Sequence, residues 1–136
     1  MTREEAIEFI RGAHFGYLAT VDTDNRPRVR PVGIHTVYGN DLYFFTFSNT
    51  RKCAELAANP HVEVVWTDAK KLSQVRIRGL CSAVDDPAVK QQFRDDEPFV
   101  SKILPPGAEH LFCLYKIEPE VVEAAEGLVP YQPVAW

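Results

Sequence analysis

Residues 42–56 read LYFFTFSNTRKCAEL and join an apolar run to a polar one. Leu42 to Phe47 shows no polar alternation, which predicts a strand covered on both faces. Ser48-Asn49-Thr50 supplies helix N-cap residues, so a helix is expected over Arg51 to Ala58, ended by Asn59-Pro60. The centre of the chain is therefore a strand that runs directly into a helix N-terminus.

Further strands are expected on both sides of this segment, because polar turn residues separate other β-branched and aromatic runs. The expected strands are His14–Val21, Arg26–Val37, Leu42–Phe47, His61–Thr67, Gln74–Val84 and Leu111–Ile117. Short helices are expected over Thr2–Gly12, from Pro87 onward and near Phe99–Leu104, whereas Val121–Ala125 fits a helix or an edge strand. The pattern predicts a mainly β, six-stranded antiparallel split barrel with small flanking helices, as a single domain over residues 1–136.

Composition excludes several classes of function. The chain has 136 residues and a net charge of −4, so no global positive field would attract nucleic acid. It shows no signal-peptide pattern and no apolar run of the roughly 18 residues that a membrane span needs, so a cytoplasmic protein is expected. The histidines and Cys53, Cys81 and Cys113 lack metal-ligand spacing, so no metal site is expected and the cysteines are interpreted as small core residues.

Three arginines alternate along the second expected strand. Arg26, Arg28 and Arg30 share one face, where they repel each other unless an anion or an acidic partner is present. Pro27 and Pro31 each remove a backbone donor, which places this strand at a sheet edge or at a bulge.

A second group of cations stands at the start of the expected central helix. Arg51 and Lys52 lie where the helix dipole favours acidic residues, and a local rule broken in this way often marks function. The free N–H groups there attract an anion such as phosphate, although a solvated surface pair is the alternative. On the fifth strand, Gln74 shares a face with Arg76 and Arg78 and offers both a donor and an acceptor.

Several of these segments occur together in one known order. Arg30 to Gly33, Leu42 to Leu56, Asn59-Pro60, Trp66 and Gln74 to Gly79 resemble the pyridoxamine 5'-phosphate oxidase-like, FMN-binding split-barrel superfamily. The similarity is to its short members, which include relatives of nitroimidazole-resistance reductases. The resemblance implies a homodimer with FMN at the subunit interface and a small-molecule substrate.

The resemblance also implies a role for each site residue. The phosphate is expected to bind Arg30 and Lys52 with Thr50 and Arg51, the flavin ring to run beside Arg30–Gly33, and Gln74 to reach the cofactor from the second subunit. The ring or ribityl chain is expected to contact Phe45 and Thr46. The full cofactor-binding set is Arg30, Pro31, Val32, Gly33, Phe45, Thr46, Thr50, Arg51, Lys52 and Gln74.

The predicted function is an FMN-dependent oxidoreductase that reduces a small electrophilic substrate, with no catalytic side chain assigned. The alternatives are a non-catalytic flavin-binding module for storage or sensing, and a relative that binds F420 or haem. Vitamin B6 oxidation is not expected, because the oxidase's C-terminal Arg-x-His element is replaced by Val129–Trp136. The apolar end Tyr131–Trp136 is a candidate arm over the partner's cofactor, and His35 is either structural or a flavin contact.

Overall fold

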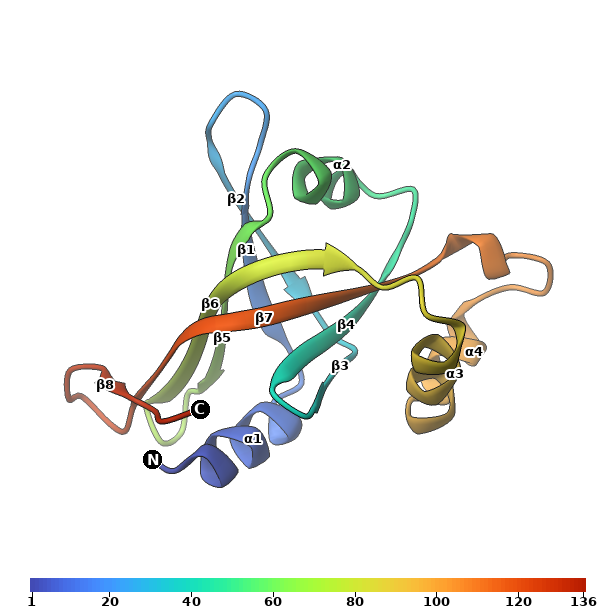
Figure 1. Cartoon of the computed structure of the whole chain (residues 1–136). Helices are drawn as coiled ribbons and strands as arrows, with labels where there is room; N and C mark the ends of the chain where they lie inside the picture. Colours follow the sequence, from blue (N-terminus) through green and yellow to red (C-terminus); the bar gives the residue numbers. More distant parts are fainter.

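Eight antiparallel strands form one curled sheet in the computed structural model, which describes residues 1–136 (Figure 1). The strands are β1 (Gly16–Val21), β2 (Pro27–Val32), β3 (His35–Tyr38), β4 (Asp41–Phe47), β5 (His61–Asp68), β6 (Ser73–Ala83), β7 (Phe112–Ala125) and β8 (Gln132–Pro133). The order across the sheet is β2-β1-β5-β6-β7-β4-β3, and β8 pairs with β7. The predicted antiparallel, mainly β architecture is confirmed, but the prediction of six strands is wrong.

Four short helices surround the sheet: α1 (Arg3–Gly12), α2 (Arg51–Ala58), α3 (Pro87–Asp96) and α4 (Phe99–Ile103). In Figure 1, α1 lies at one end of the barrel with both chain termini nearby, α2 lies at the opposite end, and α3 and α4 lie to one side. Thr2 and Glu5 form a capping box at α1, and Asp86 caps α3 ahead of Pro87. None of the four helices combines the length and the apolar character needed to cross a membrane.

One added strand comes from a break in the second expected strand. β2 ends at Val32 and β3 begins at His35, so the expected strand Arg26–Val37 is divided at Gly33 and Ile34. The Ile34 carbonyl accepts a hydrogen bond from the Phe45 amide at 3.0 Å, which turns the chain from β2 towards β4. β2 is the last strand on its side of the sheet, as its two prolines predict.

The other difference is the length of β7. Its 14 residues include Val121–Ala125, which pair with β6 inside the sheet and form neither a helix nor an edge strand. Pro119 pairs with Gly79, and the register shift between Arg78 and Gly79 leaves Glu120 of β7 without a partner in β6. A side chain on Gly79 would collide with the Glu118 carbonyl oxygen, so the bulge requires glycine there.

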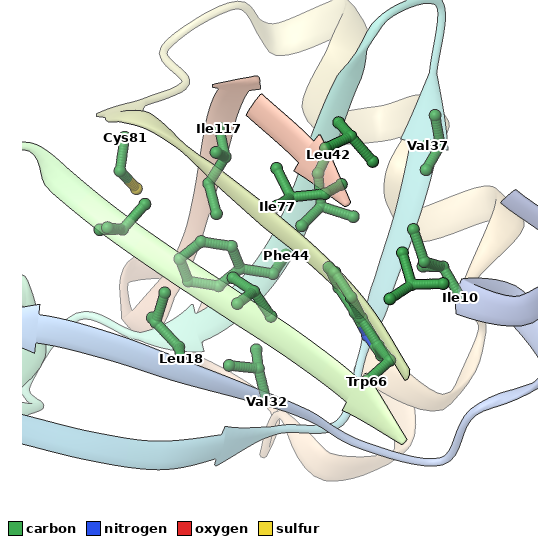
Figure 2. Close-up of a cluster of buried hydrophobic side chains, with 14 of the residues drawn as sticks. Ile10, Leu18, Val32, Val37, Leu42, Phe44, Trp66, Ile77, Cys81 and Ile117 are labelled. Carbon is green, nitrogen blue, oxygen red and sulfur yellow. The ribbon is translucent and has the colours of Figure 1, made fainter. Parts of the chain in front are cut away.

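The buried side chains form two clusters on opposite faces of β4. The barrel interior contains Trp66 and Phe44 with the aliphatic residues around them, and Ile10 of α1 seals one end (Figure 2). On the outer face, Phe45 packs with Phe93 of α3 and with its neighbours from α4. β4 is therefore covered on both faces, as its apolar run predicts, and the outer cover comes from helices of the same chain.

The C-terminal arm lies against its own chain. Gln132–Pro133 pairs with β7, and Val134 is buried in the barrel core with only 6% of its surface exposed. The Trp136 indole donates a hydrogen bond to the Asn40 carbonyl at 2.8 Å. The apolar arm thus packs on its own barrel beside α1, and its place over a partner's cofactor stays a prediction.

Candidate functional site

The predicted phosphate-binding residues meet in a hollow between β2 and the N-terminus of α2. Its volume is about 260 Å³, and its lining consists of Arg28, Val29, Arg30, Thr50, Arg51, Lys52 and Glu55. β2 supplies three consecutive residues from an edge strand, while α2 supplies its N-cap, its first turn and Glu55. The structure therefore brings together four of the predicted residues: Arg30, Thr50, Arg51 and Lys52.

Arg30 is held from one side only. Its Nη1 donates to the Thr20 hydroxyl at 2.6 Å and to the Leu18 carbonyl at 3.2 Å, while its Nη2 donates to Glu55 Oε2 at 2.6 Å. A guanidinium has five N–H donors, so the Nε–H and one Nη2–H have no partner within the protein. Two parallel donors on one guanidinium edge match the oxygens of a phosphate or a carboxylate.

Glu55 is the buried counter-ion of this network. Only 4% of its surface is exposed, and its Oε2 also accepts a hydrogen bond from the Thr20 hydroxyl. Burial opposes ionisation, but the Thr20 hydrogen bond and the Arg30 charge outweigh it and lower the pKa of Glu55. Its second oxygen, Oε1, is buried without a hydrogen-bond partner. The carboxylate thus fixes Arg30 in place at the wall of the hollow.

The first turn of α2 carries no negative charge of its own. It contains no acidic residue, and the Thr50 side chain does not cap it, because its hydroxyl donates to the Phe47 carbonyl at 2.9 Å. Burial, together with the Arg30 charge, lowers the pKa of Lys52. An uncapped helix N-terminus beside cations has the donors and the charge to bind an anion.

The remaining residues of β2 present mainly backbone. Val32 lies in the barrel core and is 5% exposed, whereas Pro31 and Gly33 are exposed at the sheet edge. The Phe15 ring lies against Gly33, where a Cβ atom would come within 3.2 Å of it. An edge strand has unpaired backbone groups, so Pro31–Gly33 can accept a planar ligand along its outer side.

The side chains of Phe45 and Thr46 are buried in this structure. Phe45 is 7% exposed and stacks on Phe112, with the ring centroids 5.5 Å apart. Thr46 is 4% exposed. The structure therefore leaves little of either side chain for a ligand, although both belong to the strand that leads into the hollow.

Gln74 lies away from the other predicted site residues. It pairs with Thr67 of β5 and with Ala125 of β7, and it does not line the hollow. Its side-chain oxygen accepts a hydrogen bond from the Tyr131 hydroxyl, and Arg76 lies 3.9 Å above the Tyr131 ring. A single chain does not bring Gln74 to the α2 end of the barrel.

Three further candidates have structural partners. Arg26 pairs with Asp24 and Arg28 with Asp22, each at 3.1 Å, so both arginines have acidic neighbours. His35 Nε2 lies 2.9 Å from the Ile10 carbonyl, and burial lowers the pKa of this imidazole. These contacts support the structural interpretation of His35.

Two residues of the site were not identified from the sequence. Thr20 and Glu55 hold Arg30, yet Glu55 lies on a short helix where a carboxylate usually faces solvent. Its burial depends on the approach of β1 and β2, which no local pattern encodes. No group of three or more His, Cys, Asp or Glu side chains is arranged to hold a metal ion.

Comparison with solved structures supports the fold. The chain is similar to a NimC/NimA family protein from Clostridium acetobutylicum, with a TM-score of 0.80 and 22% identity over 96% of this chain and 91% of that one. It is also similar to a haem-binding protein from Mycobacterium smegmatis, with a TM-score of 0.77 and 16% identity over 96% of this chain and 56% of that one. At these identities the likeness shows the fold alone.

Comparison at the level of sequence gives the family. The chain is 33% identical over 88 residues to the pyridoxine/pyridoxamine 5'-phosphate oxidase of Psychrobacter sp. (strain PRwf-1), a match that spans 63% of this chain and 40% of that enzyme. It thus covers less than half the length of this curated relative. The family model described as pyridoxamine 5'-phosphate oxidase matches residues 2–124. The chain therefore belongs to the pyridoxamine 5'-phosphate oxidase family.

Proposed function

We propose that this protein binds FMN, with the phosphate in the hollow between β2 and α2, and acts as an oxidoreductase on a small electrophilic substrate. The observation that carries the proposal is Arg30, whose buried partners orient it while two of its donors stay free. Lys52 and the uncapped first turn of α2 supply further positive charge at the same place. A terminal phosphate fits this set of donors better than a neutral ligand does.

The surface next to the hollow fits a flavin ring. Phe15, Tyr17 and Val29 are exposed by 51%, 41% and 69%, respectively, and all three lie on or beside the β1–β2 edge. Exposed apolar side chains that lie next to one another mark a binding surface more often than single exposed ones do. We therefore place the isoalloxazine ring along Pro31–Gly33, with the phosphate at Arg30 and Lys52.

When bound, the flavin supplies the hydride or electron transfer, and the protein orients the cofactor and tunes its charge. Arg30 and Lys52 hold the phosphate, while Glu55 and Thr20 fix the direction of the Arg30 guanidinium. The backbone of Pro31–Gly33 offers donors and acceptors to the ring. No side chain of the site is assigned as a general acid or base.

A second copy of the chain would complete the site. Gln74 lies away from the hollow, so its expected contact with the cofactor requires a partner subunit. Leu80 of β6, together with Tyr17 and Val29, exposes apolar surface on the outside of the sheet. We propose a homodimer in which this face is shared and Gln74 of the partner subunit reaches the flavin.

Titration of apo-protein with FMN, riboflavin, F420 and haem tests the cofactor. We expect FMN to bind tightest and riboflavin, which lacks the phosphate, to bind roughly ten- to a hundredfold more weakly. Equal affinity for FMN and riboflavin would contradict the proposed phosphate site. Preferential binding of haem would contradict FMN as the cofactor. Turnover of reduced nicotinamide with an electrophilic acceptor then separates an oxidoreductase from a flavin-storage module.

Subunit mixing tests whether Gln74 acts across the interface. If Lys52 and Gln74 of one site come from different chains, mixing Lys52→Ala with Gln74→Ala protein restores one intact site in each mixed dimer. Tight flavin binding should therefore reappear in the mixture at one site per mixed dimer, although neither variant shows it alone. Absence of recovery in dimers shown to have exchanged subunits would place both residues in the same chain.

A further inference from the structure

The C-terminal arm carries a tyrosine that contacts two side chains of β6. Gln74 and Arg76 are two residues apart on this strand, so their side chains lie on the same face of the sheet. The Tyr131 hydroxyl donates a hydrogen bond to Gln74 Oε1, and the centroid of the Tyr131 ring lies 3.9 Å from Arg76 Cζ. Tyr131 therefore contacts the one predicted cofactor residue that belongs to β6.

Contacts of the backbone and of the ring hold this tyrosine in place. Gln132, the next residue, pairs with β7, and Val134 is buried in the barrel core. Arg76, which lies over the ring, is itself paired with Glu63 of β5, whose Oε1 lies 3.3 Å from the Arg76 Nε. The ring is thus fixed by the arm and by a paired cation, so its hydroxyl is directed to Gln74.

The hydrogen bond decides which end of the Gln74 amide is free. A glutamine side chain has one acceptor oxygen and one nitrogen that carries two N–H donors. The Gln74 oxygen accepts from the Tyr131 hydroxyl, whereas its nitrogen, Nε2, makes no hydrogen bond within the chain and is open to the surface. In this orientation Gln74 offers a ligand N–H donors. Without the tyrosine hydroxyl the amide could turn over and offer its oxygen instead.

We infer that Tyr131 is a positioning residue, which orients the Gln74 amide so that it donates a hydrogen bond to an acceptor atom of the flavin that the other subunit binds. The inference rests on the proposed homodimer, in which Gln74 reaches the flavin across the interface. The flavin ring has several carbonyl oxygens and ring nitrogens that accept hydrogen bonds, and these gain negative charge on reduction. A donor placed there stabilises the reduced flavin more than the oxidised one and raises its reduction potential.

A double-mutant cycle on flavin binding tests this role. Tyr131→Phe keeps the ring and removes only its donor, so it should weaken FMN binding by roughly two- to tenfold and make the midpoint potential of the bound flavin more negative. Gln74→Ala removes the whole contact and should weaken binding at least as much. The double variant should bind FMN like Gln74→Ala alone, because Tyr131 acts through Gln74. Tyr43 packs against the outer-face cluster of β4, so Tyr43→Phe is the matched control and should change neither quantity.

Gln74→Glu tests the direction of the hydrogen bond to the flavin. A carboxylate still accepts from the Tyr131 hydroxyl, but it has no N–H to donate. This variant should therefore bind FMN no better than Gln74→Ala does, and the potential of its bound flavin should be more negative than that of the wild type. Wild-type affinity in Gln74→Glu would overturn the assignment of Gln74 as a donor.

The outcomes separate the role of Tyr131 from the flavin site itself. Suppose that the wild-type protein binds FMN and that Gln74→Ala weakens this binding. Unchanged binding in Tyr131→Phe, or the same loss from Tyr131→Phe with and without Gln74, then overturns the positioning role alone. If Gln74→Ala binds FMN like the wild type, the contact across the interface is absent, and if the wild-type protein binds no FMN, the proposed function fails. The positioning role falls in both of these cases as well.

Discussion

The two ends of the barrel are closed in different ways. At the α1 end, large side chains fill the opening, with Trp66 and Ile10 fully buried and Trp136 hydrogen-bonded to the β3–β4 turn. At the α2 end, the buried group is a carboxylate, Glu55, whose partner Arg30 keeps two donors free. Apolar packing at the α1 end stabilises the fold, whereas the free donors at the α2 end can bind a ligand. Substitutions at the α1 end should therefore change stability, and substitutions at the α2 end should change ligand binding.

The largest effect is expected at the α1 end. Trp66→Ala removes a fully buried indole and should lower the free energy of unfolding by about 3–5 kcal/mol. Denaturant unfolding of apo-protein measures this. Leu72→Ala, at a half-exposed turn position, is the control and should change stability by about 0.5 kcal/mol or less. The flavin affinity of the folded Trp66 variant should remain near that of the wild type. A large loss of flavin affinity in this variant would contradict the division of roles between the two ends.

The next effect is expected on binding alone. Lys52→Ala removes a cation from the hollow and should weaken FMN binding by about 1.5–3 kcal/mol, or roughly ten- to a hundredfold. Stability should change by about 0.5 kcal/mol or less. Fluorescence quenching on titration with FMN measures the affinity, with Lys102→Ala on α4 as the control. Unchanged FMN affinity would exclude Lys52 from the site.

A smaller change should affect both properties together. Thr20→Val keeps the shape of the side chain but removes the hydroxyl that lies between Arg30 and Glu55. We expect a loss of about 1 kcal/mol in unfolding free energy, with weaker binding of FMN but not of riboflavin. Thr67→Val on the exposed side of β5 is the matched control. Equal weakening for both flavins would show that Thr20 does not act through the phosphate.

The smallest effect is a dependence of stability on pH at the α1 end. Because burial lowers the pKa of His35, the folded state favours neutral imidazole. The unfolded chain takes up a proton near its ordinary value of about 6.5, so stability is full above that pH and falls as the pH drops. His35→Phe should flatten the decline in melting temperature between about pH 7.5 and 5.5, while His61→Gln should leave it. If the melting temperature of His35→Phe falls with pH as steeply as that of the wild type, titratable groups other than His35 cause the decline.

The sequence predicted the regular parts of the fold because their signals are local. The helix over Arg51–Ala58 and the position of β2 at a sheet edge follow from caps and prolines next to them. The predicted strand Leu111–Ile117 is shorter than β7 because a proline such as Pro119 normally ends a strand. Gly79, which allows β7 to continue past Pro119, lies forty residues earlier in the sequence. Glu55 was missed for the same reason, since its role depends on Arg30 from another element.

The cover of β4 shows a different limit of sequence reasoning. The apolar run from Leu42 to Phe47 predicts burial on both faces, which is confirmed, but it does not identify the covering element. Here the outer face meets Phe93, Val100 and Leu104 of the same chain, so this strand needs no partner. The proposed second copy is supported instead by Gln74, which lies away from the hollow, and by the exposed face around Tyr17.

The bulge at Glu120, next to Pro119, also affects local opening of the fold. Proline has no amide hydrogen, and the register shift at Gly79 interrupts the ladder between β6 and β7 at the same level. The strand is therefore divided into one segment that pairs with β4 and another, Val121–Ala125, that carries β8. Native-state hydrogen exchange should find two units, with amides of the second opening at lower free energy while those next to β4 stay protected. The C-terminal arm can then detach and return without unfolding the strands that support the cationic hollow.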